Sequence, residues 1–363
     1  MTNRSSLMMV RAALVSFSVA AAVLVGWSAC LPSEPAIVAI DGGMGSLHPP
    51  DGGTEAGVLP MRKCDVNKPF LNPRRIDDNV PGDKRGARLS RDELVMYYAL
   101  AKSEEGGRHR HPWHLMTAKR DAIGDTFKEG SELENIGQCY WGQEFPTITS
   151  DGMRVIFSAI AQDGASQELL YFAKRGDSPC KGGVGDPSKF GKPEKLPQSV
   201  NLYRSSLHPF LYELFDGGRE LWFSSGPEGG GSLELYRMRI TGDDWAADAS
   251  FTERERVLTL TANDEDIAPV LSADGLEIFW AAQRGSDPDG DGIPTDIWTA
   301  QRIDSGQHFT NPRLVGELST PLFEGPSWLS PDGCRLYYFA STDADASFRR
   351  MTDLFVAERS PSP

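Results

Sequence analysis

Residues 287 to 296 carry acidic side chains at a spacing that suits a hard cation. The segment reads Asp287-Pro288-Asp289-Gly290-Asp291-Gly292, and Asp296 follows it. Alternating aspartates place carboxylate oxygens on one side of a tight loop, and Gly292 permits the turn that brings a backbone carbonyl toward the ion. We therefore predict a calcium site formed by Asp287, Asp289, Asp291 and Asp296, with an ordinary solvated loop as the alternative.

This acidic segment resembles the calcium loops of EF-hands and of thrombospondin type 3 repeats. The match is incomplete, because Thr295 and Trp298 occupy positions where those loops often supply further acids. The resemblance implies calcium binding and gives no reason to expect a catalytic role for the ion.

A histidine-rich segment is the second group whose residue types could do chemistry. His109, His111 and His114 have a spacing at which imidazoles can share a transition metal. Arg108 and Arg110 alternate with them and would repel such an ion, so we interpret the segment as a solvated basic loop. The chain contains no Gly-x-Ser-x-Gly, His-Glu-x-x-His or Walker motif, so we expect a protein that is not an enzyme.

Composition and charge limit the classes of partner. The chain has 363 residues, of which 39% are hydrophobic and 24% charged, so it can bury a sizeable core. Its 37 Lys and Arg against 51 Asp and Glu give a formal net charge of −14. Nucleic acid requires a basic face that matches its phosphates, so we expect no nucleic-acid partner.

The first 63 residues indicate export and anchoring. Arg4 and Arg11 precede an apolar run over residues 12–25 that is too short for a comfortable membrane span, as in a secretion signal. The run ends in Trp27-Ser28-Ala29-Cys30, which resembles the lipobox of bacterial lipoproteins. We predict a signal over 1–29, lipid on Cys30 and a Pro- and Gly-rich tether over 30–63; an ordinary signal that leaves Cys30 free is the alternative. Leu31 is not the Asp that retains some lipoproteins at the inner membrane, which favours the outer membrane, on its periplasmic or surface face.

From about residue 64 the sequence repeats. Five segments place a turn between two apolar runs, and in four of them the turn is Asp-Gly, which is typical of hairpins. A further apolar run follows each hairpin, and an aromatic residue opens a fourth short segment in each unit. The turn aspartates lie 59, 65, 58 and 58 residues apart, at Asp92, Asp151, Asp216, Asp274 and Asp332. Four strands per unit, repeated five times, predict an all-β propeller of five four-stranded blades over residues 64–363.

The repeat resembles that of TolB-type periplasmic propellers. The closest copy combines Leu329-Ser330-Pro331-Asp332-Gly333 with Asp353-Leu354-Phe355-Val356-Ala357-Glu358-Arg359. Two turns depart from it, because Glu93 replaces the glycine of the first and the third reads Asp216-Gly217-Gly218, so we expect both to be bulged or longer. Membership of that family implies a scaffold for protein contacts and does not imply a reaction.

The order of segments predicts how the ring closes. The segment from Phe70 to Asp77 matches an outermost strand, and the chain ends after a third strand, so the N-terminal strand should complete the last blade. This closure brings Cys64 close to Cys334, and Cys139 and Cys180 flank blade 2. We favour disulfides 64–334 and 139–180 in an oxidising compartment, with four unpaired buried thiols as the alternative.

Acidic residues gather at the predicted entry of the channel. Glu144, Asp266 and Glu324 precede a proline at the start of three inner strands, so they could form a ring that attracts a cation or a basic segment. Alternatively, each accepts hydrogen bonds within its own loop. We therefore expect a tethered scaffold that binds cell-envelope proteins, possessing basic or extended segments, and that contacts the membrane through its lipid only. The alternatives are an envelope polysaccharide-binding protein and a five-bladed glycoside hydrolase with carboxylates deep in the channel.

Overall fold

The computed structural model describes ten stretches of the chain. They are residues 64–76, 82–101, 113–161, 167–203, 205–214, 216–226, 231–260, 265–283, 295–341 and 352–361. Cys30, the tether, His109, His111, Asp287, Asp289 and Asp291 lie outside them. The described residues belong to one compact unit, Glu55–Pro363, and no helix among them is long and apolar enough to cross a membrane.

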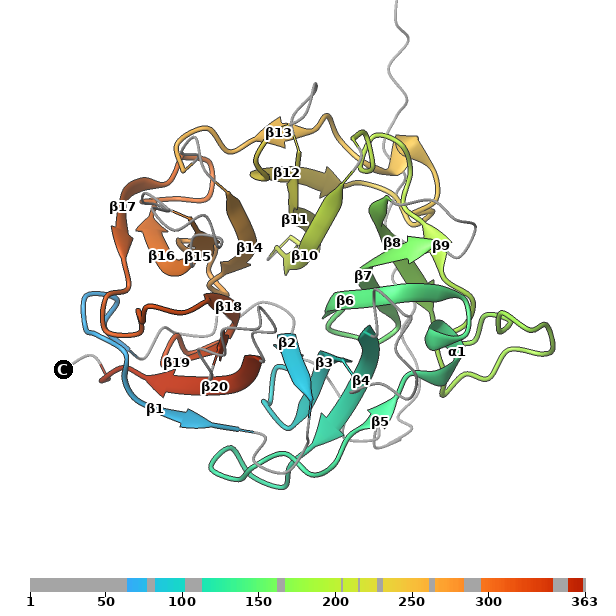
Figure 1. The fold of residues 1–363 in the computed structure, drawn as a ribbon. Coiled ribbons are helices and arrows are strands. Elements are labelled where there is room, and N and C mark those ends of the chain that lie inside the picture. Colours follow the sequence, from blue (N-terminus) through green and yellow to red (C-terminus); the bar gives the residue numbers. More distant parts are fainter. Residues whose placement is uncertain are drawn as a thin grey trace, which may run out of the picture. The chain divides into compact units, whose positions relative to one another are not determined.

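Five four-stranded antiparallel sheets form this unit, as Figure 1 shows. Blade 1 contains β2 (Asp83–Leu89), β3 (Val95–Ala101), β4 (Trp113–Lys119) and β5 (Ser131–Glu132). Blade 2 contains β6 (Tyr140–Ile148), β7 (Arg154–Ala161), β8 (Glu168–Lys174) and β9 (Glu194–Lys195), and the short α1 (Glu134–Gly137) precedes it. Blade 3 contains β10 (Ser206–Glu213), β11 (Arg219–Ser225), β12 (Glu234–Ile240) and β13 (Glu255–Arg256), with the 3-10 helix Asp248–Ser250 before β13.

Blades 4 and 5 complete the ring. Blade 4 contains β14 (Asp266–Leu271), β15 (Glu277–Ala282), β16 (Asp296–Gln301) and β17 (Thr310–Leu314). Blade 5 contains β18 (Glu324–Leu329), β19 (Arg335–Ser341) and β20 (Thr352–Glu358), and β1 (Leu71–Arg75) from the N-terminal side pairs with β20. The prediction of five blades closed by an N-terminal strand is therefore confirmed.

The core lies between the blades. A sheet packed on both faces reads as a continuous apolar run, and β15 is buried at all of its positions. The largest fully buried side chains include Trp222, Trp245 and Trp280. Trp222 packs edge-on against Phe309 of the next blade, with ring centroids 6.0 Å apart. Contacts of this kind join successive sheets into one ring.

A recurrent arginine fixes the outer strand of four blades. Its Nε donates to the carbonyl of the turn residue, at 2.6 Å from Arg359 to Gly333, and its guanidinium lies over the aromatic ring that opens the outer segment. The other three pairs are Arg120 over Phe127, Arg175 over Phe190 and Arg302 over Phe309. In blade 3, Ile240 bridges to Phe251 instead. Stacking of the arginine on the ring explains why the other four units carry an aromatic residue at this position.

The two atypical hairpin turns differ from expectation. Glu93 adopts φ 62° and donates its N–H to Ser90 O at 2.8 Å, just as Gly275 with φ 68° does to Ser272 O. The blade 1 turn is therefore neither bulged nor longer. The blade 3 turn is shorter: Leu214 N bonds Gly218 O, four residues on, whereas Ser272 N bonds Glu277 O, five residues on.

Two disulfides join the cysteine pairs that the sequence analysis favoured. Cys64 pairs with Cys334, next to the closing strand, and Cys139 pairs with Cys180 beside blade 2. Cys64 also forms a β-bridge with Pro361, so both ends of the described chain are held at blade 5. Disulfides are consistent with a location outside the cytoplasm.

Candidate binding site at the channel mouth

The inner strand and the third strand of each blade begin at the same end of the ring. In blade 4 the register pairs Asp266 with Ala282 and Ala282 with Asp296, so both aspartates lie at one level. We call this end the channel mouth and define it by its acidic residues. They are Asp83, Glu144, Glu168, Glu234, Glu265, Asp266, Asp296, Glu324 and Asp353.

The three carboxyl groups expected at the mouth have different surroundings. Thr320 donates to Glu324 through its backbone N–H, at 3.3 Å, and through its hydroxyl. Trp280 Nε1 donates to Asp266 Oδ1 at 2.8 Å. Arg85 donates to Glu144 Oε2 at 3.5 Å. The alternative prediction is that each acid accepts hydrogen bonds within its own loop. Glu324 fits this description well, because Thr320 is its donor, whereas Glu144 fits it less well, because Arg85 belongs to another blade.

Blade 1 and blade 2 share a cluster at the mouth that the sequence analysis missed. The guanidinium of Arg85 lies 4.0 Å from the ring centroid of Trp113 and bonds Asp83 at 3.0 Å. Burial raises the pKa of Glu168 to about 8, and the charge of Glu144 adds to that effect. Burial also raises the pKa of Glu144, against the attraction of Arg85. Glu168 is therefore largely protonated at neutral pH.

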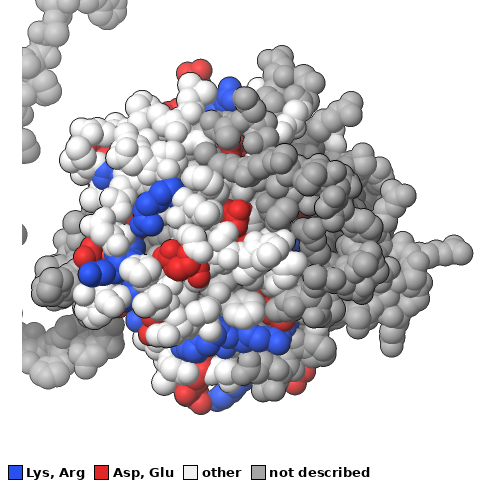
Figure 2. Space-filling view, turned by 60° about the vertical axis from the view of Figure 1, so that its left-hand side comes forward, with Lys and Arg blue, Asp and Glu red and all other residues white. Residues whose placement is uncertain are grey.

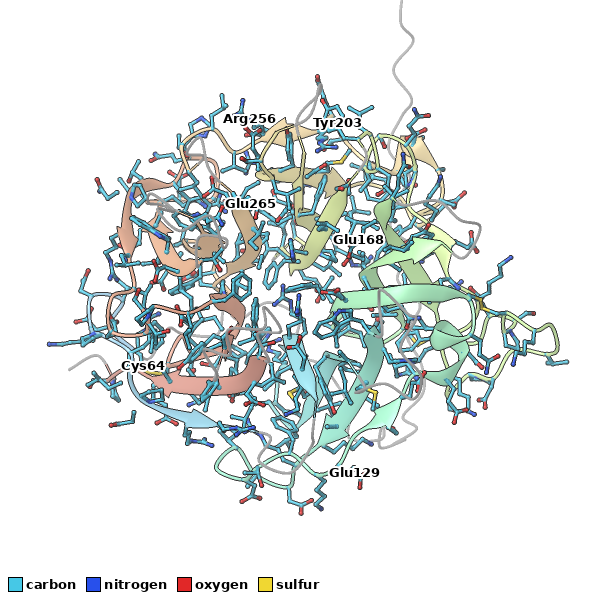
Figure 3. All side chains as sticks on the ribbon, viewed as in Figure 1. Cys64, Glu129, Glu168, Tyr203, Arg256 and Glu265 are labelled. Carbon is cyan, nitrogen blue, oxygen red and sulfur yellow. A yellow bond between two sulfur atoms is a disulfide. The ribbon has the colours of Figure 1, made fainter. Side chains whose placement is uncertain are left out.

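Cations neutralise only part of the mouth. Asp353 accepts from Lys84 Nζ at 3.0 Å and pairs with Arg75 at 2.7 Å, and Glu234 pairs with Arg256. Among the described residues, no cation forms an ion pair with Glu168, Glu265 or Glu324. Burial raises the pKa of Glu324 to about 7 and raises that of Glu265. Figure 3 shows Glu168 and Glu265 toward the inside of the ring, with Tyr203 and Arg256 at its periphery.

The expected metal ligands are located only in part. Asp296 begins β16 and accepts a hydrogen bond from the Ser319 hydroxyl. The described part of the chain contains no group of three or more His, Cys, Asp or Glu that could hold a metal ion. His114 lies in β4, not in a loop, and its Nδ1 is 2.9 Å from Glu132 Oε1.

Below the mouth, side chains fill the channel. The inner strands of all five blades are bulged, and in blades 1 to 4 the residue at the bulge has positive φ, for example 50° at Phe145 and 53° at His208. Phe145 packs edge-on against His208, with centroids 4.3 Å apart, and against Phe339 of blade 5. These rings separate the mouth from the opposite end of the ring.

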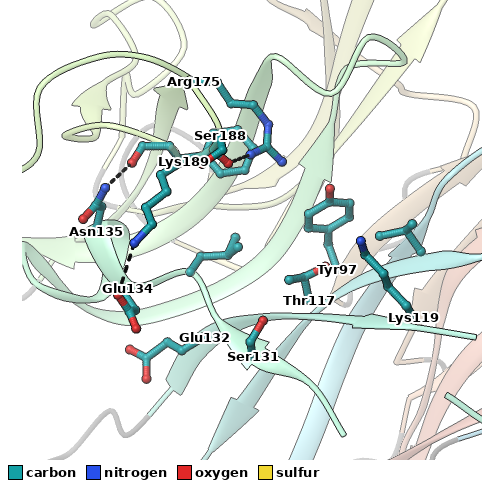
Figure 4. A pocket seen from close by; sticks show the side chains of 13 residues that line it. Tyr97, Thr117, Lys119, Ser131, Glu132, Glu134, Asn135, Arg175, Ser188 and Lys189 are labelled. Carbon is teal, nitrogen blue, oxygen red and sulfur yellow. Dashed lines mark hydrogen bonds and ion pairs between the residues drawn. The ribbon is translucent and has the colours of Figure 1, made fainter. Parts of the chain in front are cut away.

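A groove on the outside of blades 1 and 2 is a second concave site, lined by polar and apolar side chains (Figure 4). It has a volume of about 440 Å³ and is lined by Tyr97, Thr117, Lys119 and residues of α1 and the loop before β9. Asn135 donates to Phe190 O at 2.9 Å, and Lys189 Nζ lies 3.8 Å from Glu134 Oε2. No sequence motif indicates this groove, because its residues come from five separate segments.

The sequence matches no protein-family model and no curated protein. A mannose phosphorylase from Leishmania mexicana has a similar structure, with 12% identity over 81% of this chain and 90% of that chain and a TM-score of 0.51. A TolB from Agrobacterium tumefaciens is 13% identical over 78% of this chain and 92% of that chain, with a TM-score of 0.37. A thermostable family-43 glycoside hydrolase is 12% identical over 79% and 98%, with a TM-score of 0.48. At these identities the similarity shows the propeller fold alone.

Proposed function

We propose that this protein is an exported propeller, tethered through lipid on Cys30, whose channel mouth binds a cationic segment of another cell-envelope protein. One observation carries the proposal. The mouth gathers buried carboxyl groups, and no cation among the described residues forms an ion pair with Glu168, Glu265 or Glu324, although the charge of Arg85 acts on Glu168. A Lys or Arg of a partner would supply the missing charge, and each ion pair would favour the ionised form of the acid it meets.

Charge distribution elsewhere agrees with a local site. Figure 2 shows Lys and Arg interspersed with Asp and Glu over the described residues of one side, with no continuous basic surface there. The net charge of −14 also favours a cationic partner over nucleic acid. The partner is therefore defined by its chemistry as a basic, extended segment that can enter between the starts of the inner strands.

The test is titration with a penta-lysine peptide at low ionic strength, because the natural partner is unidentified. Glu168→Gln removes one ionisable carboxyl group from the mouth, and Glu129→Gln makes the same change at an exposed position on the periphery (Figure 3). We expect Glu168→Gln to weaken binding about tenfold, near 1.4 kcal/mol, and Glu129→Gln to leave it unchanged. Equal affinities of the two variants, or no binding by the parent protein, would rule out the mouth as the site.

Anchoring is tested separately by labelling with a radioactive fatty acid in a bacterial host. The parent protein should carry the label, and Cys30→Ser should lose it and leave the membrane fraction. Label retained in Cys30→Ser would show that the lipid is attached elsewhere or that no lipobox is used.

Glycoside hydrolysis is the second candidate. It is favoured by two acids, Glu144 and Glu168, whose charges interact. A glycosidase needs one protonated and one ionised carboxyl group, and Glu168 titrates near pH 8 while Arg85 supports ionisation of Glu144. Glu144 lies within β6, so an inner strand supplies one of these two acids. Release of reducing sugar from envelope polysaccharides by the parent protein, abolished in Glu168→Gln, would establish it; no release from any of them would exclude it.

A further inference from the structure

Arg88 crosses the channel below the mouth. It belongs to the inner strand of blade 1, yet its guanidinium lies 5.0 Å from the ring centroid of Phe210 in blade 3. Its NH2 group donates to Pro209 O at 3.4 Å, which is a long hydrogen bond. Because blade 2 lies between these two blades in the ring, the side chain must extend across the central channel. Arg88 follows Arg85 by three residues, so it lies up to about 10 Å further from the mouth.

The buried guanidinium has no countercharge within the described part of the protein. Arg88 is 2% exposed, and its Nε and NH1 atoms have no hydrogen-bond partner among the residues that the structure describes. No described carboxylate lies within ion-pair distance of it, and burial alone lowers its pKa to about 9. It therefore stays charged at neutral pH. An uncompensated buried charge is strongly unfavourable.

His208 supplies a second unpaired polar atom in the same region. It is 9% exposed, and its Nδ1 has no partner among the described residues. Burial, with the nearby charges of Arg88 and Arg85, lowers its pKa to about 3. The ring is therefore neutral and can donate from one nitrogen. It adds a hydrogen-bond donor to the channel without adding a second positive charge.

We propose that Arg88 holds a small monoanion of halide size inside the channel, with His208 as an additional donor. A single charge matches a single guanidinium beside a neutral imidazole. Small size follows from the burial of Arg88 and from the rings of Phe145, His208 and Phe210 that fill this part of the channel. The site is separate from the acidic mouth and does not depend on the function proposed for it.

Stability measured against chloride concentration tests the site. Ionic strength is held constant by replacing chloride with gluconate, which is too large for the channel. Above the dissociation constant, each tenfold rise in chloride should raise the ratio of folded to unfolded protein about tenfold. Arg88→Met should abolish that dependence, whereas Arg91→Met, at an exposed position on the turn of the same blade, should retain it.

Bromide soaked into crystals of the parent protein gives an independent readout if Arg88→Met does not fold. The expected result is an anomalous peak within hydrogen-bonding distance of Arg88 Nε or NH1. No peak there, or a chloride dependence that is absent in the parent protein or unchanged in Arg88→Met, would overturn the proposal and leave water as the occupant.

Discussion

The guanidinium of Arg359 lies over the ring of Phe70, 4.8 Å from its centroid, and joins the last blade to the N-terminal segment of the described chain. Both side chains are buried. Arg359 also forms a bidentate pair with Glu277 of blade 4, at 3.1 and 2.8 Å. One arginine therefore connects the closing strand, its own blade and the preceding blade.

We predict that Phe70→Ala lowers the free energy of unfolding by about 3 to 5 kcal/mol, because it leaves a cavity and exposes Arg359. Urea denaturation measures the change. Leu71→Ala is the control, since Leu71, the next residue and the first of β1, is 49% exposed. Equal loss of stability in the two point variants would contradict the importance of the contact between Phe70 and Arg359 for closure.

A protein that begins at about residue 80 lacks β1 altogether and should aggregate or melt early.

Glu93 stands where four blades have glycine, and we predict that glycine is the worse residue there. Its carboxylate accepts from Arg335 at 2.8 and 2.6 Å and from Tyr337 at 2.6 Å. Glu93→Gly relieves about 1 kcal/mol of backbone strain but removes the bidentate partner of a partly buried Arg335, which keeps only Asp332 at 3.1 Å, a loss of about 3 kcal/mol. Thermal and urea unfolding should show net destabilisation. A variant more stable than the parent protein would contradict the conclusion that the contacts of Glu93 with Arg335 and Tyr337 stabilise the junction of blades 1 and 5.

Stability should fall as pH rises from about 7 to about 8. Glu168 titrates near 8 and Glu324 near 7 in the folded protein, whereas an unfolded Glu titrates near about 4.3. The folded state therefore binds more protons in this range, and its advantage is lost as pH approaches the folded pKa. Below about pH 6.5, His208 makes stability increase as pH rises, because its pKa in the folded protein is about 3 and the unfolded state binds the proton more readily.

Urea unfolding at several pH values measures this slope. Glu168→Gln should flatten it between pH 7 and 8, and Glu129→Gln should leave it as in the parent protein. A slope that is the same in all three proteins would mean that Glu168 titrates normally.

Calcium binding by Asp287, Asp289 and Asp291 remains a prediction. Extracellular modules of this kind bind calcium at about 0.1 to 1 mM, and ligand at ten times Kd adds about 1.4 kcal/mol of stability. Millimolar calcium should raise the melting temperature, magnesium should raise it less, and Asp289→Ala should remove the difference. An unchanged melting curve together with no heat of binding in calorimetry would identify an ordinary solvated loop.

The fold was predictable from the sequence because the blades repeat. The candidate site was less predictable because its residues depend on contacts between blades. Ser272, Asp274 and Gly275 recur with equivalents in other blades because hydroxyl, carboxylate and positive φ together close each turn. Glu93 breaks that pattern, and its compensating partner Arg335 is 242 residues away. Glu168 could have been found, since an acid also stands near the start of three other third-strand segments. Arg88 could not, because nothing local indicates that its side chain crosses the channel.

Proton release is the sharpest measurement of whether the acidic mouth binds a cationic segment. Glu168 is largely protonated at pH 7, so pairing with a lysine ammonium should expel its proton. Calorimetric titration of penta-lysine in two buffers with different heats of ionisation counts that proton. We predict net proton release by the parent protein and by Glu129→Gln, and clearly less proton release by Glu168→Gln. Binding without proton release, or equal release from all three proteins, would contradict it.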